Sequence, residues 1–132
     1  MALPRLLRYA WASPATAIGL QFVLLALVSG GKVRVVRGAI EIHGGWAAAF
    51  LRRGLPCLRR AAAMTLGHVI IGLDQGCLNH SRRHEHVHVR QYERWGPLML
   101  PLYLAASLVL YVRGHDPYLD NPFEREAYEE AP

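Results

Sequence analysis

The sequence predicts an α+β protein, in which an N-terminal membrane helix precedes a small three-stranded sheet and three main helices. Three observations predict this fold class: an uncharged run over residues 9–31, two alternating segments within 32–43, and histidines at helical spacing within 80–95. The 132 residues leave room for a single domain. We therefore expect a membrane helix over residues 1–31 and one small domain over residues 32–132.

The composition favours a membrane protein. Hydrophobic residues make up 52% of the chain and charged residues 19%, a balance more apolar than that of an ordinary soluble domain. The net charge of +5 is concentrated in residues 32–94, directly after the uncharged run. A basic block beside an apolar segment fits an anionic membrane surface. The arginines are scattered and no nucleic-acid-binding motif is present, so we expect no nucleic-acid partner.

The uncharged run from Tyr9 to Gly31 is long enough for a membrane helix. A helix needs about 20 mostly apolar residues to cross a bilayer. Arg5 and Arg8 precede the run, which is also how a signal peptide begins. We predict an uncleaved membrane helix, and a cleaved signal peptide and a buried core helix are the alternatives.

The next segments predict the sheet. Residues 32–37 and 39–43 both alternate polar and apolar side chains around Gly38, which is typical of a β-hairpin. Trp46 to Arg53 is expected to be a short helix. Residues 65–71 are β-branched and apolar, and they predict the third strand.

The histidine-rich segment predicts the central helix. Asn79 or Ser81 can cap its start, and Gly96 after Trp95 is a natural end. Residues 72–77 are then expected to form the turn that precedes this helix.

Two further helices follow. Residues 97–112 form a second uncharged run, whose sixteen positions are short for a membrane span. The last helix begins with Asn121 at the cap, Pro122 at the first position and Glu124 three residues after the cap.

The spacing of His84, Glu85 and His88 predicts a metal site. Positions i and i+4 of a helix lie on one face, so the two imidazoles can point at one metal ion. Glu85 lies beside this face, where it can reach a metal-bound water without occupying a coordination position. This is the HExxH pattern of zinc hydrolases, whereas the alternative is a polar helix face whose histidines only form hydrogen bonds.

A hydrolytic zinc site needs a third protein ligand. Tyr92 stands one turn beyond His88, so the ligand must come from elsewhere in the chain. Glu124 and Glu126 are the best-placed carboxylates. Glu124 has an alternative role, because it could close a capping box with Asn121.

His84-Glu85-His86-Val87-His88 followed by Glu124-Arg125-Glu126-Ala127 resembles the gluzincin zinc metallopeptidases, in their smallest form and in bacterial membrane-associated relatives. The resemblance covers about residues 65–128. It implies that Glu124 is the third zinc ligand and that Glu85 is the general base. In many relatives an Asp that supports a ligand histidine follows the alanine, and here Tyr128 takes its place.

The expected function is therefore zinc-dependent hydrolysis of a peptide or protein substrate at the membrane. Tyr92, Tyr118, Tyr128 or His115 could hold the developing oxyanion. The basic block after the first helix predicts a cytoplasmic site. The alternative is a non-catalytic membrane protein with a structural or sensing metal site.

The remaining histidines and the two cysteines carry no predicted function. His86 is expected on the opposite side of the helix, and His80 near its start. His43 and His68 are expected to be hydrogen-bonded strand residues. Cys57 and Cys77 are expected to be free thiols, because two widely spaced cysteines form no disulfide framework.

Overall fold

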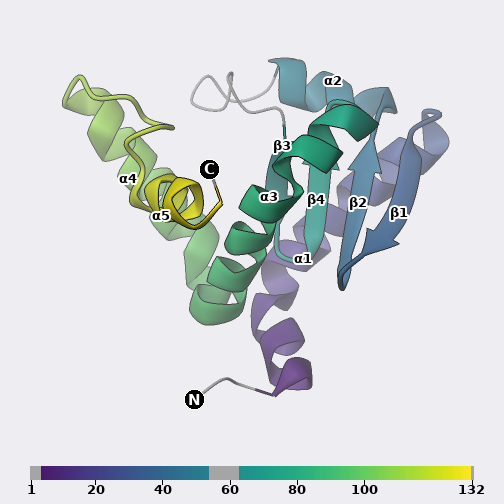
Figure 1. Ribbon diagram of the computed structural model, residues 1–132, viewed down its shortest axis with the longest axis horizontal. Coiled ribbons are helices and arrows are strands. Elements are labelled where there is room, and N and C mark those ends of the chain that lie inside the picture. Colours follow the sequence, from purple (N-terminus) through teal and green to yellow (C-terminus); the bar gives the residue numbers. More distant parts are fainter. Residues whose placement is uncertain (1–3, 54–62, 132) are drawn as a thin grey trace.

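The structure, a computed structural model, describes residues 4–53 and 63–131 and has the expected α+β class (Figure 1). In chain order its elements are α1 (Arg5–Val28), β1 (Lys32–Val36), β2 (Ala39–His43), α2 (Gly45–Arg53), β3 (Ala63–Leu66), β4 (Val69–Gly72), α3 (Gln75–Trp95), the 3-10 turn η2 (Gly96–Leu98), α4 (Met99–Val112) and α5 (Pro122–Glu130).

The strands form one four-stranded sheet in the order β1-β2-β4-β3. The hairpin predicted around Gly38 is present, with β1 and β2 antiparallel. Strand β4 pairs parallel to β2 and antiparallel to β3. Among the described strands, β3 therefore forms the edge of the sheet nearest to α4 (Figure 1).

The prediction of three strands was wrong by one. Residues 65–71 were expected to be a single strand, but they contain the end of β3, a turn at Gly67 and His68, and most of β4. Gly67 has a φ of +62°, a conformation that glycine adopts more readily than other residues. Because apolar residues lie on both sides of the turn, the sequence resembles one continuous strand and does not indicate the hairpin.

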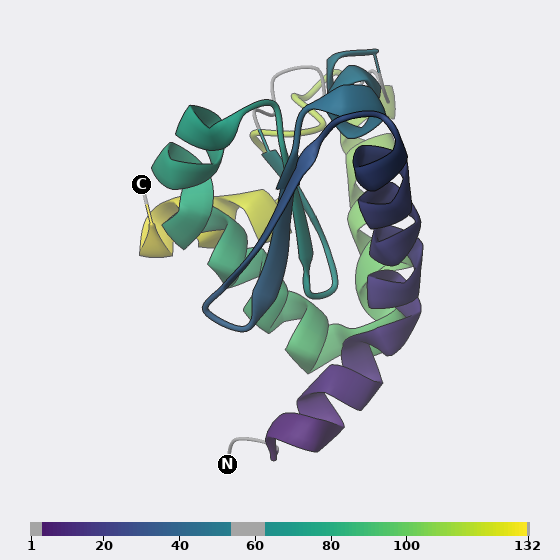
Figure 2. The same cartoon turned by 90° about the vertical axis from the view of Figure 1, so that its right-hand side faces the viewer.

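Helices cover both faces of the sheet (Figure 2). On one face, Ile42, Val69 and Ile71 pack with Ala26 of α1 and Leu51 of α2. On the other face, Ala39 and Ile70 pack with Leu78 and Val89 of α3. The alternation of side chains along each strand thus supplies two thin cores, one for each helical layer.

Helix α1 belongs to this fold through one of its sides. Ala12, Ala15 and Ala26 are buried, and a Cβ built on Gly19 would lie 2.6 Å from the Cβ of Val69. The absence of a side chain at Gly19 therefore lets α1 lie directly on the sheet. The opposite side of α1 is apolar and exposed over most of its length. Its exposed large side chains are Leu6, Leu7, Trp11, Ile18, Leu20, Leu24, Leu27 and Val28.

Helix α3 begins earlier than predicted. Its N-cap is Asp74, whose Oδ1 accepts a hydrogen bond of 2.7 Å from the N–H of Cys77. Residues 75–77, expected to lie in a turn, therefore form the first helical turn. Asn79 lies inside the helix, where its side chain accepts a hydrogen bond from Gln75. The helix begins at Asp74 and not at the predicted caps Asn79 or Ser81, because Leu78 is then buried against the sheet.

Two helical segments are long and apolar enough to cross a membrane by length and composition, Arg5–Val28 and Gln75–Val112. The second segment joins α3, η2 and α4, and its uncharged part comprises η2 and α4. Signal sequences and core helices of soluble proteins can share these features.

Candidate functional site

The HExxH residues lie on the buried side of α3. His84, Glu85 and His88 expose 9%, 4% and 4% of their surface. One ligand atom from each residue lies within 4.8 Å of the others, so this group could hold a metal ion. Burial of three titratable side chains together requires that they satisfy one another or bind a cation.

Helix α5 brings Glu124 to the two histidines. Glu124 Oε1 lies 2.9 Å from His84 Nε2 and 3.0 Å from His88 Nε2. Two atoms bound to one tetrahedral zinc ion at about 2.0–2.1 Å lie roughly 3.3 Å apart. The three side chains are therefore already close to the spacing that a shared metal ion requires.

The capping alternative for Glu124 does not describe the structure. Asn121 does cap α5, because its Oδ1 accepts a hydrogen bond of 2.9 Å from the N–H of Phe123. The carboxylate of Glu124 is instead engaged by His84 and His88 through Oε1. Its other oxygen, Oε2, accepts a hydrogen bond of 2.6 Å from the Tyr103 hydroxyl.

Glu126, the other carboxylate considered from the sequence, lies outside this cluster. Its Oε1 accepts a hydrogen bond of 2.7 Å from Gln91 Nε2. The Oε1 of Gln91 lies 2.8 Å from Nδ1 of His88. Among the described contacts, Glu126 therefore reaches His88 through Gln91, which orients the ring of that histidine.

Glu85 is held by the sheet. Its Oε1 accepts a hydrogen bond of 2.9 Å from the Thr65 hydroxyl on β3. Its Oε2 lies 3.7 Å from His84 Nε2, a distance that is long for a hydrogen bond. One carboxylate oxygen is thus fixed, and the other faces the histidine pair.

Within this cluster the pKa values of Glu85, His88 and Glu124 are shifted. Burial raises the pKa of Glu85, although the charges of His88 and His84 act in the opposite direction. Burial would also raise the pKa of Glu124, but its hydrogen bonds with the histidines outweigh this effect and hold the pKa at about 2. Burial lowers the pKa of His88 less than Glu124 and Glu85 raise it, to about 9. Positive charge is therefore stabilised between these side chains, and a bound cation can supply it.

The two histidines differ in their outer contacts. Nδ1 of His84 is buried and has no hydrogen-bond partner within the described part of the chain. The ring of Tyr128 lies 4.3 Å from the His84 ring, centroid to centroid. The hydroxyl of Tyr128 is instead 3.2 Å from that of Tyr118. Tyr128 thus contacts His84 without giving it a carboxylate acceptor.

The other residues considered for oxyanion binding are placed differently. The hydroxyl of Tyr92 donates to the backbone oxygen of Thr65 at 3.1 Å. His115 lies in the exposed segment after α4. Of the four candidates, only Tyr128 has a ring contact with a cluster histidine among the contacts of the described residues.

The remaining histidines are outside the cluster. His86 lies among arginines on another face, and His80 is exposed in the first turns of α3. His43 is on β2, as expected. His68 was expected on a strand but lies in the β3–β4 turn, where Nε2 is 2.8 Å from Glu93 Oε2. Its hydrogen bonding agrees with the prediction.

Of the cysteines, Cys77 is a free thiol on the first turn of α3. Cys57 lies outside the described residues.

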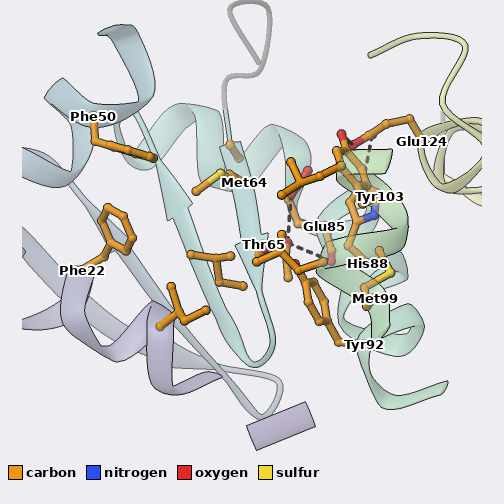
Figure 3. A pocket seen from close by; sticks show the side chains of 15 residues that line it. Phe22, Phe50, Met64, Thr65, Glu85, His88, Tyr92, Met99, Tyr103 and Glu124 are labelled. Carbon is orange, nitrogen blue, oxygen red and sulfur yellow. Dashed lines mark hydrogen bonds and ion pairs between the residues drawn. The ribbon is translucent and has the colours of Figure 1, made fainter. Parts of the chain in front are cut away.

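A cavity of about 220 Å³ adjoins the cluster (Figure 3). Its walls come from α1, α2, β3, α3, α4 and α5. At one end lie the aromatic rings of Phe22 and Phe50, whose centroids are 4.8 Å apart. At the other end lie Glu85, His88, Tyr103 and Glu124. The candidate metal centre therefore faces an open space.

Sequence reasoning did not identify Thr65, Gln91 and Tyr103 as parts of the site. Gln91 follows His88 by three residues on the same helix, a spacing that could have suggested contact. Nothing local distinguishes Thr65 within its apolar strand or Tyr103 within its apolar helix.

Comparisons with protein-family models, with curated proteins and with solved structures found no match to this chain.

Proposed function

We propose that this protein is a membrane-attached, zinc-dependent hydrolase that cleaves peptide bonds. One observation carries the proposal. Nε2 of His84 and Nε2 of His88 meet Glu124 Oε1 at 2.9 and 3.0 Å, while Glu85 beside them is anchored separately by Thr65. Three potential ligands and a separate carboxylate form the arrangement that metal-dependent hydrolysis requires.

The donor set fits zinc. Two imidazole nitrogens and one carboxylate are a common ligand set of catalytic zinc sites, which leave a further position for water. Gln91 orients His88, and Tyr103 orients Glu124. Contacts of this kind hold ligands in position before the metal arrives. In this proposal His84, His88 and Glu124 would hold the ion.

Zinc bound there would acidify a water molecule and polarise the scissile carbonyl. Glu85 would take up the proton of that water at Oε2, since Oε1 is held by Thr65. The same oxygen would then pass the proton to the leaving amine. Burial supports this role because it raises the pKa of Glu85 and so favours proton uptake.

In the proposed membrane arrangement, α1 attaches the protein to the bilayer through its exposed apolar side, which does not pack on the sheet, and α4 does not span. The 24 residues of α1 extend about 36 Å, whereas the 14 residues of α4 extend only about 21 Å. The hydrocarbon core of a bilayer is about 30 Å thick. The basic residues that follow α1 favour a cytoplasmic site by the positive-inside tendency.

A non-catalytic metal site is the second candidate function. It is favoured by Nδ1 of His84, which has no hydrogen-bond partner among the described residues, so the outer contact that raises the basicity of a metal ligand is missing there. In that case the metal would stabilise the packing of α5 against α3, and Glu85 would have no role in proton transfer.

The two functions are separated by substitutions within the motif. Purified full-length protein would be analysed for zinc content and for hydrolysis of a fluorogenic peptide library. Glu85→Gln should retain zinc and lose roughly 10²–10⁴-fold in rate, because a general base contributes about that much. His88→Ala should lose both properties. His86→Ala is the matched control, because His86 lies between them in sequence but outside the cluster.

Retained zinc together with undiminished hydrolysis in Glu85→Gln would assign proton transfer to another group. Zinc in the wild-type protein without any hydrolysis would favour the non-catalytic site. If wild-type protein and His88→Ala contain equally little zinc at saturating metal, the metal proposal is wrong.

A further inference from the structure

The cavity beside the candidate metal centre has two chemically different ends. The polar lining residues are Thr65, Glu85, His88, Tyr92, Tyr103 and Glu124, all toward α3, α4 and α5. The rest of the described lining is apolar, and it extends past Met64 to Phe22 and Phe50. A substrate group near the metal would therefore meet polar atoms, while its neighbours would lie against hydrocarbon.

Partly exposed side chains show where this cavity opens. Ile18 on α1 is 46% exposed, Phe50 on α2 is 36% exposed and Leu104 on α4 is 41% exposed, although all three line the cavity. The cluster residues at the other end are buried. The mouth is therefore bordered by α1, α2 and α4, and the site lies at the inner end.

Most of the exposed large apolar side chains of the described residues lie on α1 and α4, two of the helices that border the mouth. Helices α1 and α4 lie on the same side of the sheet (Figure 2), and they diverge from the end of α3 where α4 follows it (Figure 1). Both helices expose large apolar side chains beyond those that line the cavity. On α4 these are Leu102, Leu108, Val109, Tyr111 and Val112. If these surfaces contact lipid, the cavity opens toward the bilayer and not toward water.

We propose that the cavity admits an uncharged, apolar segment of a membrane peptide, which enters from the lipid side between α1 and α4. The inference rests on the proposed function, since it names the class of substrate that would reach Glu85 and the metal ligands. In the sequence alone, α4 was only an apolar helix; in this proposal it is one wall of the substrate path.

Charge and size support this occupant. Glu85 and Glu124 are the charged carboxyl residues among the described lining, and there is no lysine or arginine to balance an acidic substrate. An apolar cavity of about 150 Å³ holds a benzene-sized molecule. The 220 Å³ here can thus accept a large apolar side chain next to the scissile bond. At the apolar end, beside Phe22 and Phe50, a charged side chain of either sign would lose its hydration without gaining a partner.

The test separates binding from cleavage. Full-length, zinc-loaded protein with Glu85→Gln would be reconstituted into phosphatidylcholine vesicles, and peptide binding would be measured by fluorescence energy transfer. Two peptides of equal length would be compared. One is an uncharged Leu/Ala/Phe segment that inserts into the bilayer, and the other has Ser and Lys at the same positions and stays in water.

The mouth would be blocked from either side. Ile18→Trp and Leu104→Trp add bulk to residues that line the cavity, from α1 and α4 respectively. Leu20→Trp and Leu102→Trp are matched controls, because both residues are 40% exposed on the same helices but do not line it. Zinc content would verify that each variant is folded around its site.

We expect the apolar peptide to bind at least tenfold more tightly than the polar one. Each blocking variant should weaken this binding at least tenfold, and the controls should not. Equal binding of both peptides, or equal effects of blocking and control variants, would overturn the inference.

A second assay measures hydrolysis by protein that retains Glu85. It distinguishes failure of the inference about the cavity from failure of the proposed peptidase function. Cleavage of the polar peptide that is indifferent to Ile18→Trp and Leu104→Trp overturns the inference alone. If the apolar peptide binds, the blocking variants weaken its binding and no cleavage occurs, the peptidase function is overturned. The inference about which peptide occupies the cavity is then still supported.

Discussion

The two sides of the site are built in different ways. Toward α5, His84 and His88 share Glu124, and Gln91 and Tyr103 add further hydrogen bonds. Toward the sheet, the Glu85 carboxylate has one hydrogen bond within the described part of the chain, from the Thr65 hydroxyl. The first side is a connected network and the second is one contact.

In the proposed function, metal retention and proton transfer would therefore depend on different parts of the fold. The α5 side joins residues that are 36 and 40 positions apart, so it forms only when α4 has turned the chain back toward α3. The sheet side joins α3 to the edge strand β3. Substitutions on the sheet side should therefore leave zinc retention largely intact, whereas substitutions on the α5 side should lower zinc retention and hydrolysis together.

The largest effect is expected for Glu124→Ala, which removes the group that both histidines share. Zinc affinity, measured by competition with a chelator, should fall by more than about 100-fold, the upper range for loss of an outer contact to a metal ligand. Glu130→Ala is the control, because Glu130 is on the same helix but pairs with exposed Arg90. If Glu126→Ala removes zinc and Glu124→Ala does not, the two carboxylates have been assigned the wrong way round.

Gln91→Leu should have the next largest effect. The substitution keeps much of the side-chain volume but removes the acceptor of His88 Nδ1. Loss of such an outer contact typically weakens metal binding by about 10–100-fold. Chelator competition would measure it against Arg90→Leu, a change at the neighbouring exposed residue. Unchanged affinity would mean that packing alone orients His88.

Thr65→Val tests the sheet side. It preserves the shape of the side chain but removes the only side-chain hydrogen bond to Glu85 among the described residues. We expect kcat to fall by about tenfold, which corresponds to roughly 1.4 kcal/mol, close to the lower end of the range of about 1.5–3 kcal/mol for a hydrogen bond to a charged group. Zinc content should not change, and Thr65→Ser should restore the rate. A loss of zinc in Thr65→Val would contradict the separation of the two sides.

The sequence was sufficient to predict those parts of the site that follow a local period. The i, i+4 spacing placed His84 and His88 on one face, and Asn121 with Pro122 marked the start of α5 correctly. These features depend on helix geometry and on cap chemistry, which act over a few residues. For the same reason the hairpin around Gly38 could be predicted.

Features that depend on tertiary contact could not be predicted. Thr65 lies 20 residues from Glu85, and Tyr103 lies 21 residues from Glu124. Both residues lie in apolar segments, and nothing in the neighbouring sequence indicates which group their hydroxyls will contact. The start of α3 was missed because Asp74, Asn79 and Ser81 are all acceptable caps, and burial of Leu78 decides between them. The role of α4 likewise depends on which residues it faces.

The smallest effect should come from Tyr128→Asp, which would give His84 Nδ1 an acceptor, as Gln91 gives one to His88 Nδ1. His84 Nδ1 has no acceptor among the described residues, although the ring of Tyr128 lies beside it. A carboxylate at this position can accept the Nδ1 proton, fix the tautomer and strengthen the Nε2 donor. We expect zinc affinity to rise by up to about tenfold, the lower end of such contacts. Tyr128→Phe is the control: it keeps the ring contact and removes only the hydroxyl that meets Tyr118, so affinity should stay unchanged. Lower affinity in Tyr128→Asp would show that the aromatic ring itself holds His84 in place. His84 would then be oriented by packing and His88 by its hydrogen bond to Gln91.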